Sequence, residues 1–529
     1  MDIEINDLTR FGVVKDIPGY QIPPEAFTLG ENVRFADGGI ERMLGDERTF
    51  GTPLYPPHFA MPLTTAAQTF WLYVSLTKAA AFDGATHTDI TRLAGDYTND
   101  ETRKWNGTIL GGVPILNNGN DVPQAWLSPT TATRLVNLPN WNPNHRARVV
   151  RALGPYLIAI NLLDSGNAYP HLIQWSHPAD PGSVPISWDY TDPTKDAGRK
   201  DLPDVNSGLL IEALPLQGRL FLYKEGSVWW MRAIGGRFVF EFDTFLETVG
   251  LLAPRCVTPT PDGLQHVMAT QDDIVRHNGN QVVSILDKAQ KRAIFNDIDN
   301  THASNSFMFT NPLYNEVWFC YPSSGNEHPN KAVVWNAKEG QAGILSNSDV
   351  VSFRNVASGV IEAISDASWD SDSASWDSDD SPWSQILRRK LVMCDPANTQ
   401  FRMMDTGNLR NGASFAATLQ REGLSVLGQN RRGEWLVDHQ IMKMIQRLWP
   451  KVKGGPIRVR IGATQTVGGA TTWGPYASFD PATQKWVDPS YTIPGTSTGC
   501  SISVEFSTID PVSWRIEGYK PEIIKLGRF

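Results

Sequence analysis

The sequence of 529 residues contains few groups that could cross-link the chain. It has four cysteines, Cys256, Cys320, Cys394 and Cys500, and none of them forms a C-x-x-C pair. Scattered cysteines of this kind are typical of buried thiols in a reducing compartment. We therefore expect neither a disulfide framework nor a cysteine metal site.

Long apolar runs are also missing. The best candidate, Ala152 to Leu163, is shorter than the roughly 18 to 20 residues of a membrane helix and contains Pro155. The N-terminus, Met1-Asp2-Ile3-Glu4, is acidic and lacks the apolar segment of a signal peptide. We therefore predict no transmembrane segment and folding in a cytoplasm.

Charged residues are scarce, at 19% against ~25% in an average domain. The net charge is −9, from 47 basic and 56 acidic residues. This charge keeps a large particle soluble and argues against nucleic-acid binding over the whole surface. With 41% hydrophobic residues the chain can still bury a substantial core.

Catalytic motifs are absent: the sequence has no phosphate-binding glycine loop, no H-E-x-x-H and no G-x-S-x-G. His266 and His277 fall on neighbouring predicted strands, but a metal site needs about three or four converging ligands. Asp272, Asp273 or Glu316 could be nominated as glycosidase carboxylates, yet nothing distinguishes them from ordinary turn and strand residues. We predict no catalytic residue, cofactor or metal, and no enzyme activity.

Short alternating strands joined by tight turns are what the sequence has in abundance. Residues 219–224, 227–232 and 237–242 predict a meander whose turns contain Gly226, Gly235 and Gly236. Asn278-Gly279 marks another hairpin, of type I′. Repeated meanders predict a mainly β fold: a β-propeller-like core of about five to seven blades, without WD40 or kelch signatures, and a C-terminal, sandwich-like β unit.

Helical signals are few. Residues 287–295 are a candidate for a short helix, with basic residues toward its end. Residues 434–445 are a weaker candidate, and loops or strands remain the alternative for both. The strand at residues 32–35 is available to pair with a C-terminal strand and so close the propeller.

Residues 366–383 form an acidic tract with six aspartates and no basic residue, in which Ser-Trp-Asp-Ser-Asp occurs twice. It is too polar for a core, so we expect a surface loop. Trp369, Trp376 and Trp383 suggest that it packs on something, either within the chain or on a partner, where they could act as interface anchors. A disordered insertion is the alternative, and Asp oxygens could also bind Ca²⁺, although EF-hand spacing is absent.

Residues 385–460 invert the charge, with fourteen Lys/Arg against five Asp/Glu, a net of +9 that leaves −18 for the rest of the chain. Opposed charge zones suit oriented stacking on a charged partner, although a solvated basic strand face is the simpler alternative. The candidate contact residues here are Arg388, Arg389, Lys390, Arg431 and Arg432.

These changes in strand pattern, composition and charge along the sequence predict five consecutive segments. Residues 1–50 are an N-terminal arm with the first strands, and 51–365 form the propeller. Residues 366–384 are the acidic surface loop, and 385–449 are a further β blade with a basic bias. Residues 450–529 are the C-terminal β unit with the closing strands.

Several stretches together resemble one family. They are Glu31-Asn-Val-Arg-Phe-Ala-Asp-Gly-Gly-Ile-Glu-Arg42, Trp175-Ser-His-Pro-Ala-Asp-Pro181, Leu222-Tyr-Lys-Glu-Gly-Ser-Val-Trp229, Asn315-Glu-Val-Trp-Phe-Cys-Tyr-Pro322 and the Ser-Trp-Asp-Ser-Asp tract. In this order, over roughly residues 30 to 450, the chain resembles the tail nozzle or hub proteins of short-tailed bacteriophages, also called tubular tail protein B or packaged-DNA stabilisation proteins.

The resemblance implies a structural virion protein, assembled in the host cytoplasm. Six copies would form a ring below the portal and the head-to-tail adaptor ring, with the propellers outside. The ring would retain the packaged genome and conduct it into the host during ejection, with transient contact to double-stranded DNA in the channel. Tail fibres or spikes would dock around it.

The composition is compatible with such a conduit, because every phosphate contact adds a salt-sensitive attraction that would slow the passage of DNA. The basic zone would then meet an acidic partner ring or make a limited contact with the DNA end. The alternative function is a propeller receptor-binding protein that recognises or cleaves host-surface glycan. A third hypothesis is that the chain is a cytoplasmic scaffold protein with a propeller fold.

Overall fold

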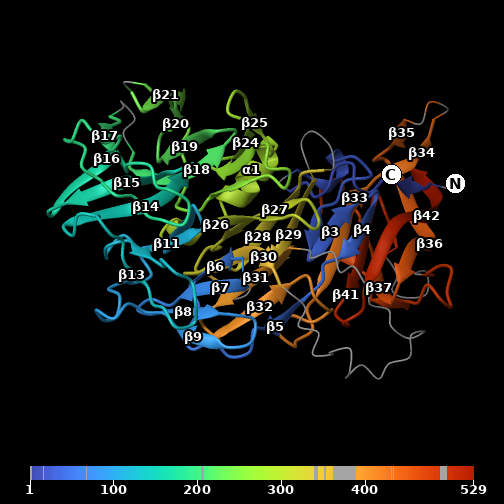
Figure 1. Cartoon of the computed structure of the whole chain (residues 1–529). Helices are drawn as coiled ribbons and strands as arrows, with labels where there is room; N and C mark the ends of the chain where they lie inside the picture. The colour runs from blue at the N-terminus through green and yellow to red at the C-terminus, as the bar shows by residue number, and fades with distance from the viewer. Residues whose placement is uncertain are drawn as a thin grey trace, which may run out of the picture. The chain divides into compact units, whose positions relative to one another are not determined.

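The computed structural model is built mainly of β-strands (Figure 1). It describes residues 3–15, 17–66, 68–203, 208–236, 238–338, 344–350, 353–361, 389–430, 432, 434–488 and 497–528. No helix among these residues is long and apolar enough to cross a membrane. The chain separates into two compact units: unit 1 is Met1–Glu47, Cys256–Val351 and Asp405–Phe529, and unit 2 is Arg48–Arg255 and Ser352–Met404.

Unit 2 is a series of four-stranded antiparallel sheets. The first two contain β6 (Phe59–Thr64), β7 (Thr69–Val74), β8 (Ala79–Phe82) and β9 (His87–Asp89), then β10 (Asn106–Leu110), β11 (Val113–Asn117), β12 (Gln124–Ala125) and β13 (Val136–Asn137). The next two contain β14 (His145–Leu153), β15 (Tyr156–Asp164), β16 (Asn167–Trp175) and β17 (Gly198–Asp201), then β18 (Leu210–Leu216), β19 (Arg219–Lys224), β20 (Val228–Ala233) and β21 (Phe240–Leu246). The last contains β30 (Asn355–Val360), β31 (Arg389–Asp395) and β32 (Gln400–Met404), with β5 (Asp46–Thr49) at its edge.

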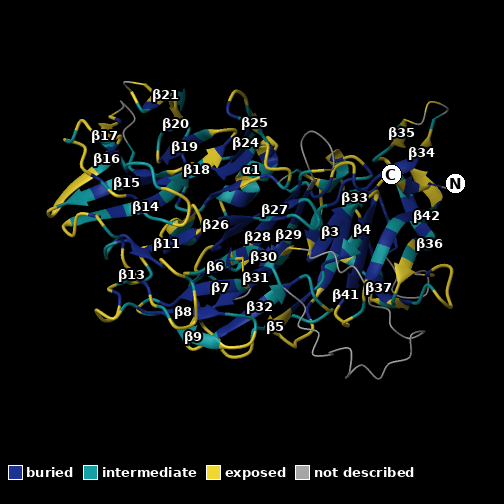
Figure 2. Cartoon of the chain, in the orientation of Figure 1, coloured by how far each residue is buried: buried dark blue, intermediate teal, exposed yellow. Residues whose placement is uncertain are grey.

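The sheets of unit 2 pack against one another through their first strands. Strand β14 contacts both β10 and β18, and β30 contacts β6. Apolar side chains from successive sheets share one core, as when Val149 of β14 packs with Leu220 of β19. Because the inner strands β7, β11 and β19 are buried on both faces, the sequence places apolar residues on both sides of them (Figure 2). The predicted β-propeller-like core of short meanders is confirmed.

Unit 1 contains two further meanders. The first is β22 (Val257–Pro259), β23 (His266–Ala269), β24 (Ile274–His277) and β25 (Val282–Ser284). The second is β26 (Phe307–Asn311), β27 (Glu316–Tyr321), β28 (Lys331–Asn336) and β29 (Ile344–Asp349). It continues through β2 (Leu29–Glu31), β33 (Ala417–Leu424), β41 (Ser501–Thr508), β37 (Ile457–Thr464) and β38 (Thr472–Trp473) into a ten-stranded sheet, with β39 (Ala477–Phe479) beside β37.

A second sheet of unit 1 packs against the part of the ten-stranded sheet that contains β33, β37 and β41. It contains β3 (Val33–Ala36), β4 (Gly39–Arg42), β42 (Trp514–Arg528), β36 (Ile441–Gly454) and β40 (Thr498–Gly499), and β1 (Ile5–Asn6) pairs with β42. Side chains from both sheets, among them Leu419, Leu448, Val504 and Ile516, form one buried core. This is the sandwich-like β unit that the sequence predicts.

The N- and C-terminal strands are joined in this sandwich. Strand β42 pairs with β1 and β4, and Ile40 lies opposite Ile516. The expectation that residues 32–35 would make this pairing is wrong, because β4 separates β3 from β42. The pairing also builds the sandwich of unit 1, since the core behind it is the shared core of the two facing sheets.

Of the two helices that the sequence predicts, one is confirmed and one is wrong. Helix α1 (Lys288–Phe295) confirms the first: Asp287 accepts from the Gln290 backbone N–H, and the Gln290 side chain accepts from that of Asp287. The second is wrong, because residues 434–445 contribute to β35 (Trp435–Val437) and β36. Pairing of β36 along nearly the whole of β42 overrides the local helical tendency.

The segments of the two units alternate along the sequence. The sequence predicts consecutive segments, including one β blade over residues 385–449, whereas β31 and β32 belong to unit 2 and residues from Asp405 onward to unit 1. Long-range pairing such as β33 with β41 has no local signature in the sequence, which explains the difference.

Candidate functional site

Five of the eight predicted contact residues lie outside the part of the chain that the structure describes. Trp369, Trp376, Trp383, Arg388 and Arg431 all lie outside the described residues. Their proposed role in partner contacts therefore stays a prediction.

The other three candidate contact residues are divided between the units. Arg389 and Lys390 begin β31 of unit 2; Arg389 is exposed opposite Val360, and Lys390 is half-buried. Arg432 belongs to unit 1 and is exposed in the turn between β34 (Val426–Gln429) and β35. Each of these three side chains is at least partly accessible to a partner.

Within unit 1, much of the basic zone is used by the chain itself. Lys453 Nζ lies 2.6 Å from Glu517 Oε1, and Lys451 pairs with Glu4. Lys443 is buried and donates to the carbonyl oxygens of Asp438, Ile441 and Cys500, and its burial lowers its pKa. These contacts reduce the charge that the zone presents to a partner.

Glu316, which could be nominated as a catalytic carboxylate, is part of a buried ion network. Arg34 Nε lies 2.5 Å from Glu316 Oε1, and Arg34 Nη2 lies 2.9 Å from Asp405 Oδ1. Trp318 Nε1 donates to Glu316 Oε2 at 3.0 Å, and Asn311 donates to Asp405 at 2.7 Å. Burial is the main cause that raises the pKa of Glu316, and Arg34 partly opposes it. The network cross-links β3, β27 and the segment after β32, and it leaves Glu316 out of reach of a substrate.

The remaining carboxylate and histidine nominees are also engaged in the fold. Asp273 accepts from Lys291 Nζ at 2.5 Å and from Ser284 Oγ at 3.0 Å, which ties the β23–β24 turn to α1. His266 and His277 lie directly opposite each other on β23 and β24, as predicted, with ring centroids 5.4 Å apart. Burial, and secondarily His266, lowers the pKa of His277 to about 3.

One end of unit 1 exposes apolar side chains. Leu436 and Val437 of β35 are 45% and 49% exposed, and Ile524 and Leu526 of β42 are 36% and 54% exposed. Only a short turn separates Val437 from β36, whose first residues pair with the last residues of β42. Figure 1 shows β34, β35 and this end of β42 at the same end of the unit. We call these four residues the apolar tip.

Basic residues flank the apolar tip. Arg432, Lys525 and Arg528 are exposed there, and Glu434 is the exposed acidic neighbour on the hairpin. The hairpin is fixed to the unit because Trp435 Nε1 donates to Glu25 Oε1 at 2.9 Å. The tip thus combines the apolar area and the basic charge that favour contact with an acidic protein surface.

The sequence analysis nominated Arg432 as a contact residue, which stays a prediction, and it did not identify the apolar tip. In the sequence, Leu436 and Val437 lie in a segment that resembles a helix, and Leu526 ends what looks like an ordinary buried strand. Exposure distinguishes them from core residues, and exposure depends on the pairing of β36 with β42.

Comparison with known proteins gives only distant likenesses. No protein-family model matches the chain, and no curated protein matches it. One similar solved structure is PorZ, an essential surface component of the type-IX secretion system of Porphyromonas gingivalis, with 7% identity and a TM-score of 0.33. The match covers 84% of this chain and 46% of PorZ, so the chain spans less than half of PorZ's length.

A second is a putative 6-phosphogluconolactonase from Bacteroides fragilis, with 9% identity and a TM-score of 0.36 over 72% of this chain and 92% of that one. Neither likeness is close enough to bear on function.

Proposed function

We propose that the chain is a structural subunit of the tail of a short-tailed bacteriophage, six copies of which form the nozzle or hub ring. The ring retains packaged DNA and conducts it into the host. The sequence resemblance supports this proposal, and the structural observation that carries it is the apolar tip with its basic flank.

The occupant that we assign to the apolar tip is a neighbouring copy of the chain. A closed ring uses a heterologous interface, in which one surface of each subunit meets a different surface of the next. Such an interface needs two complementary patches. The tip supplies an apolar, basic patch, and the chain as a whole is acidic, with a net charge of −9, which favours contact of this patch with another copy.

Native mass spectrometry combined with negative-stain electron microscopy tests the proposal on the full chain. We expect a ring with a central hole and a mass of about 352 kDa, six times the subunit mass of 58.6 kDa. If the chain is monomeric alone, it is mixed with the candidate adaptor ring. Failure to form rings there as well would contradict the proposal.

Leu526→Asp is expected to abolish the ring, because it places a carboxylate in the centre of the apolar contact. The matched control is Val467→Asp, which changes a residue of the same unit that is 51% exposed and lies outside the tip. We expect the control to assemble like the natural chain in the same mass measurement. Equal assembly of both variants would show that the tip is not the interface.

A glycan array on the same sample separates this function from the receptor-binding alternative. A structural ring subunit is expected to show no saturable glycan binding. Saturable binding by a monomer that also fails to assemble would favour the receptor-binding protein instead.

A further inference from the structure

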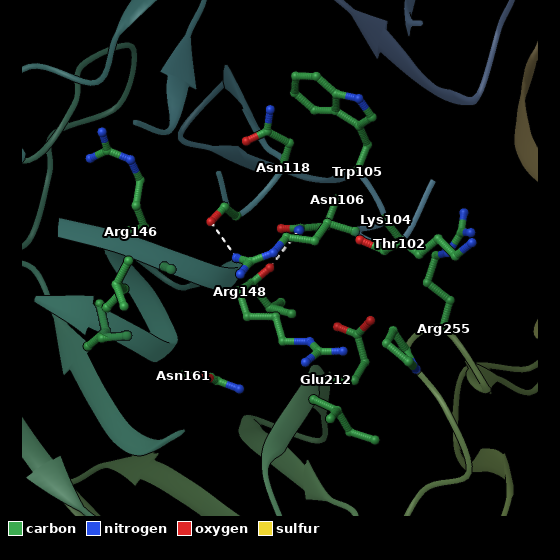
Figure 3. Close-up of a pocket in the computed structure, with 18 of the residues that line it drawn as sticks. Thr102, Lys104, Trp105, Asn106, Asn118, Arg146, Arg148, Asn161, Glu212 and Arg255 are labelled. Atoms are coloured by element: carbon green, nitrogen blue, oxygen red, sulfur yellow. Dashed lines mark hydrogen bonds between the residues drawn. The ribbon is translucent and has the colours of Figure 1, made fainter. Parts of the chain in front are cut away.

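We infer that unit 2 contains a binding site for a small phosphate-type anion, in a cavity where the first strands of three sheets meet (Figure 3). The cavity has a volume of about 320 Å³ and is lined mainly by residues of β10, β14, β15 and β18 and by the residues that precede β10 and β22. This inference concerns unit 2 alone and does not depend on the proposed ring.

The residues that line the cavity carry mostly positive charge. Its cations are Arg103, Lys104, Arg146, Arg148 and Arg255, and its single carboxylate is Glu212. That carboxylate is already engaged, because Glu212 Oε1 lies 2.7 Å from Arg151 Nη2 and Glu212 is buried. Among these cations, Arg103, Arg146 and Arg148 form no ion pair within the part of the chain that the structure describes.

Arg148 is the central group. Its side chain donates no hydrogen bond and forms no ion pair with any residue in the described part of the chain, although it is only partly exposed. Burial lowers the pKa of Arg148, and the positive charge of Arg103 lowers it further. In Figure 3 the Arg148 side chain extends into the same space that Glu212 faces. A cation held in this way is stabilised by an anion that enters the cavity.

The backbone around the site and the Arg103 side chain are held in place by hydrogen bonds of the chain itself. Asn106 Nδ2 donates to the Arg148 carbonyl at 3.0 Å, and Asn117 Nδ2 donates to the Ala147 carbonyl at 2.9 Å, so side chains of β10 and β11 hold the backbone of β14. Arg103 Nη1 donates to the Gly119 carbonyl at 2.7 Å. Donors fixed in this way bind with little loss of conformational entropy.

Neighbouring donors extend the site. Arg146 Nε donates to the Asn120 carbonyl at 2.8 Å, while Arg146 makes no ion pair with the described residues. Trp105 is buried at the cavity, and its Nε1 has no hydrogen-bond partner among those residues. The lining thus combines several guanidinium groups with a free N–H donor.

This chemistry selects the class of ligand. Guanidinium groups bind phosphate and carboxylate through paired N–H···O bonds, and several of them around one space favour a multiply charged oxyanion. A volume of about 320 Å³ lies at the lower end of small-molecule sites and excludes a nucleic-acid duplex. We therefore assign inorganic phosphate or pyrophosphate, or the phosphoryl group of a small ester.

Isothermal titration calorimetry of the full chain with inorganic pyrophosphate, at constant ionic strength, tests the inference. We expect saturable binding that Arg148→Met weakens at least tenfold, with a similar loss for Arg103→Met. The matched control is Lys200→Met on β17, the outermost strand of the same sheet, where Lys200 is exposed. The control is expected to bind within twofold of the natural chain.

Thermal unfolding of the variants shows whether a loss of binding comes from a folding defect. Without anion, Arg148→Met is expected to unfold at the same or a higher temperature, because it removes a poorly compensated cation. The stabilisation that pyrophosphate confers on the natural chain should disappear in this variant. Absence of saturable binding to the natural chain, or unchanged affinity in both arginine variants, would overturn the inference.

A second titration identifies the source of the phosphoryl group. It compares a dinucleotide with and without a 5′-phosphate, competing against pyrophosphate. Competition only by the phosphorylated form supports a terminal phosphate of nucleic acid as a ligand. Competition by neither form supports free phosphate compounds.

Discussion

Replacing Arg34 by methionine is expected to lower the free energy of unfolding by about 3–5 kcal/mol, the usual loss when one partner of a buried ion network is removed. The Arg34 side chain is 1% exposed, and it lies between the Glu316 and Asp405 carboxylates, which are 1% and 4% exposed. Without the guanidinium both carboxylates stay buried without a countercharge. The loss is measured as the shift of the urea midpoint at pH 7, followed by circular dichroism.

Two further variants make this prediction specific. Glu316→Gln leaves Arg34 paired with Asp405, so it is expected to cost well under half as much. Lys338→Met is the matched control, because Lys338 pairs with Asp37 at the turn after β3 and both side chains are more than 60% exposed. Exposed pairs contribute little, so the midpoint should hardly move. Similar shifts for Arg34→Met and Lys338→Met would contradict the structural role of the network.

The second large effect is a loss of stability in acid that depends on His277. Burial, and then His266, lowers the pKa of His277 to about 3 in the folded chain, against 6.5 for an ordinary histidine. Between these values the unfolded chain binds a proton that the folded chain does not. The contribution is therefore intact above pH 6.5 and is lost as the pH falls toward 3, at about 1.4 kcal/mol per pH unit.

His277→Gln removes this titration, so its stability should fall less steeply than that of the natural chain between pH 6.5 and 4. The measurement is a series of urea midpoints at closely spaced pH values. His302→Gln is the control, because the His302 side chain is 38% exposed. Parallel curves for the natural chain and His277→Gln would show that the buried histidine pair does not govern the acid response.

The local part of the fold could be predicted from the sequence. Alternating residues and glycine turns located the β19–β20–β21 meander, and basic residues toward the end of residues 287–295 indicated α1. The Asn278-Gly279 hairpin is also present, although the Asn278 side chain closes a longer turn by accepting from the backbone N–H groups of Asn280 and Gln281. All these signals act over a few residues.

Long-range features could not be predicted. Arg34, Arg421 and Lys443 look like surface residues in the sequence, yet all three are buried against partners that are distant in the chain. The anion cavity has the same origin, since Arg103 and Arg148 are 45 residues apart and meet only because β10 packs on β14. Charge alone gives no indication of which cations the fold will enclose.

During synthesis, strand β4 has to wait for its partner β42, which lies at the other end of the sequence. Glu41 lies opposite Arg515, so 474 residues separate the two strands in the chain. At about 5–20 residues per second, a ribosome needs roughly 24 to 95 s to deliver the partner of β4. Through that interval the edge of the N-terminal hairpin is open to pairing with other chains.

The sheets of unit 2 from β6 to β21, by contrast, pair strands that are consecutive in the chain and can form as they are translated. A ribosome that stalls before Trp514 therefore releases a chain whose early sheets can fold but whose sandwich lacks its central strand. Such a chain also lacks Ile524 and Leu526 of the apolar tip. Truncated chains are thus excluded from the ring, because they cannot complete the surface that we propose for assembly.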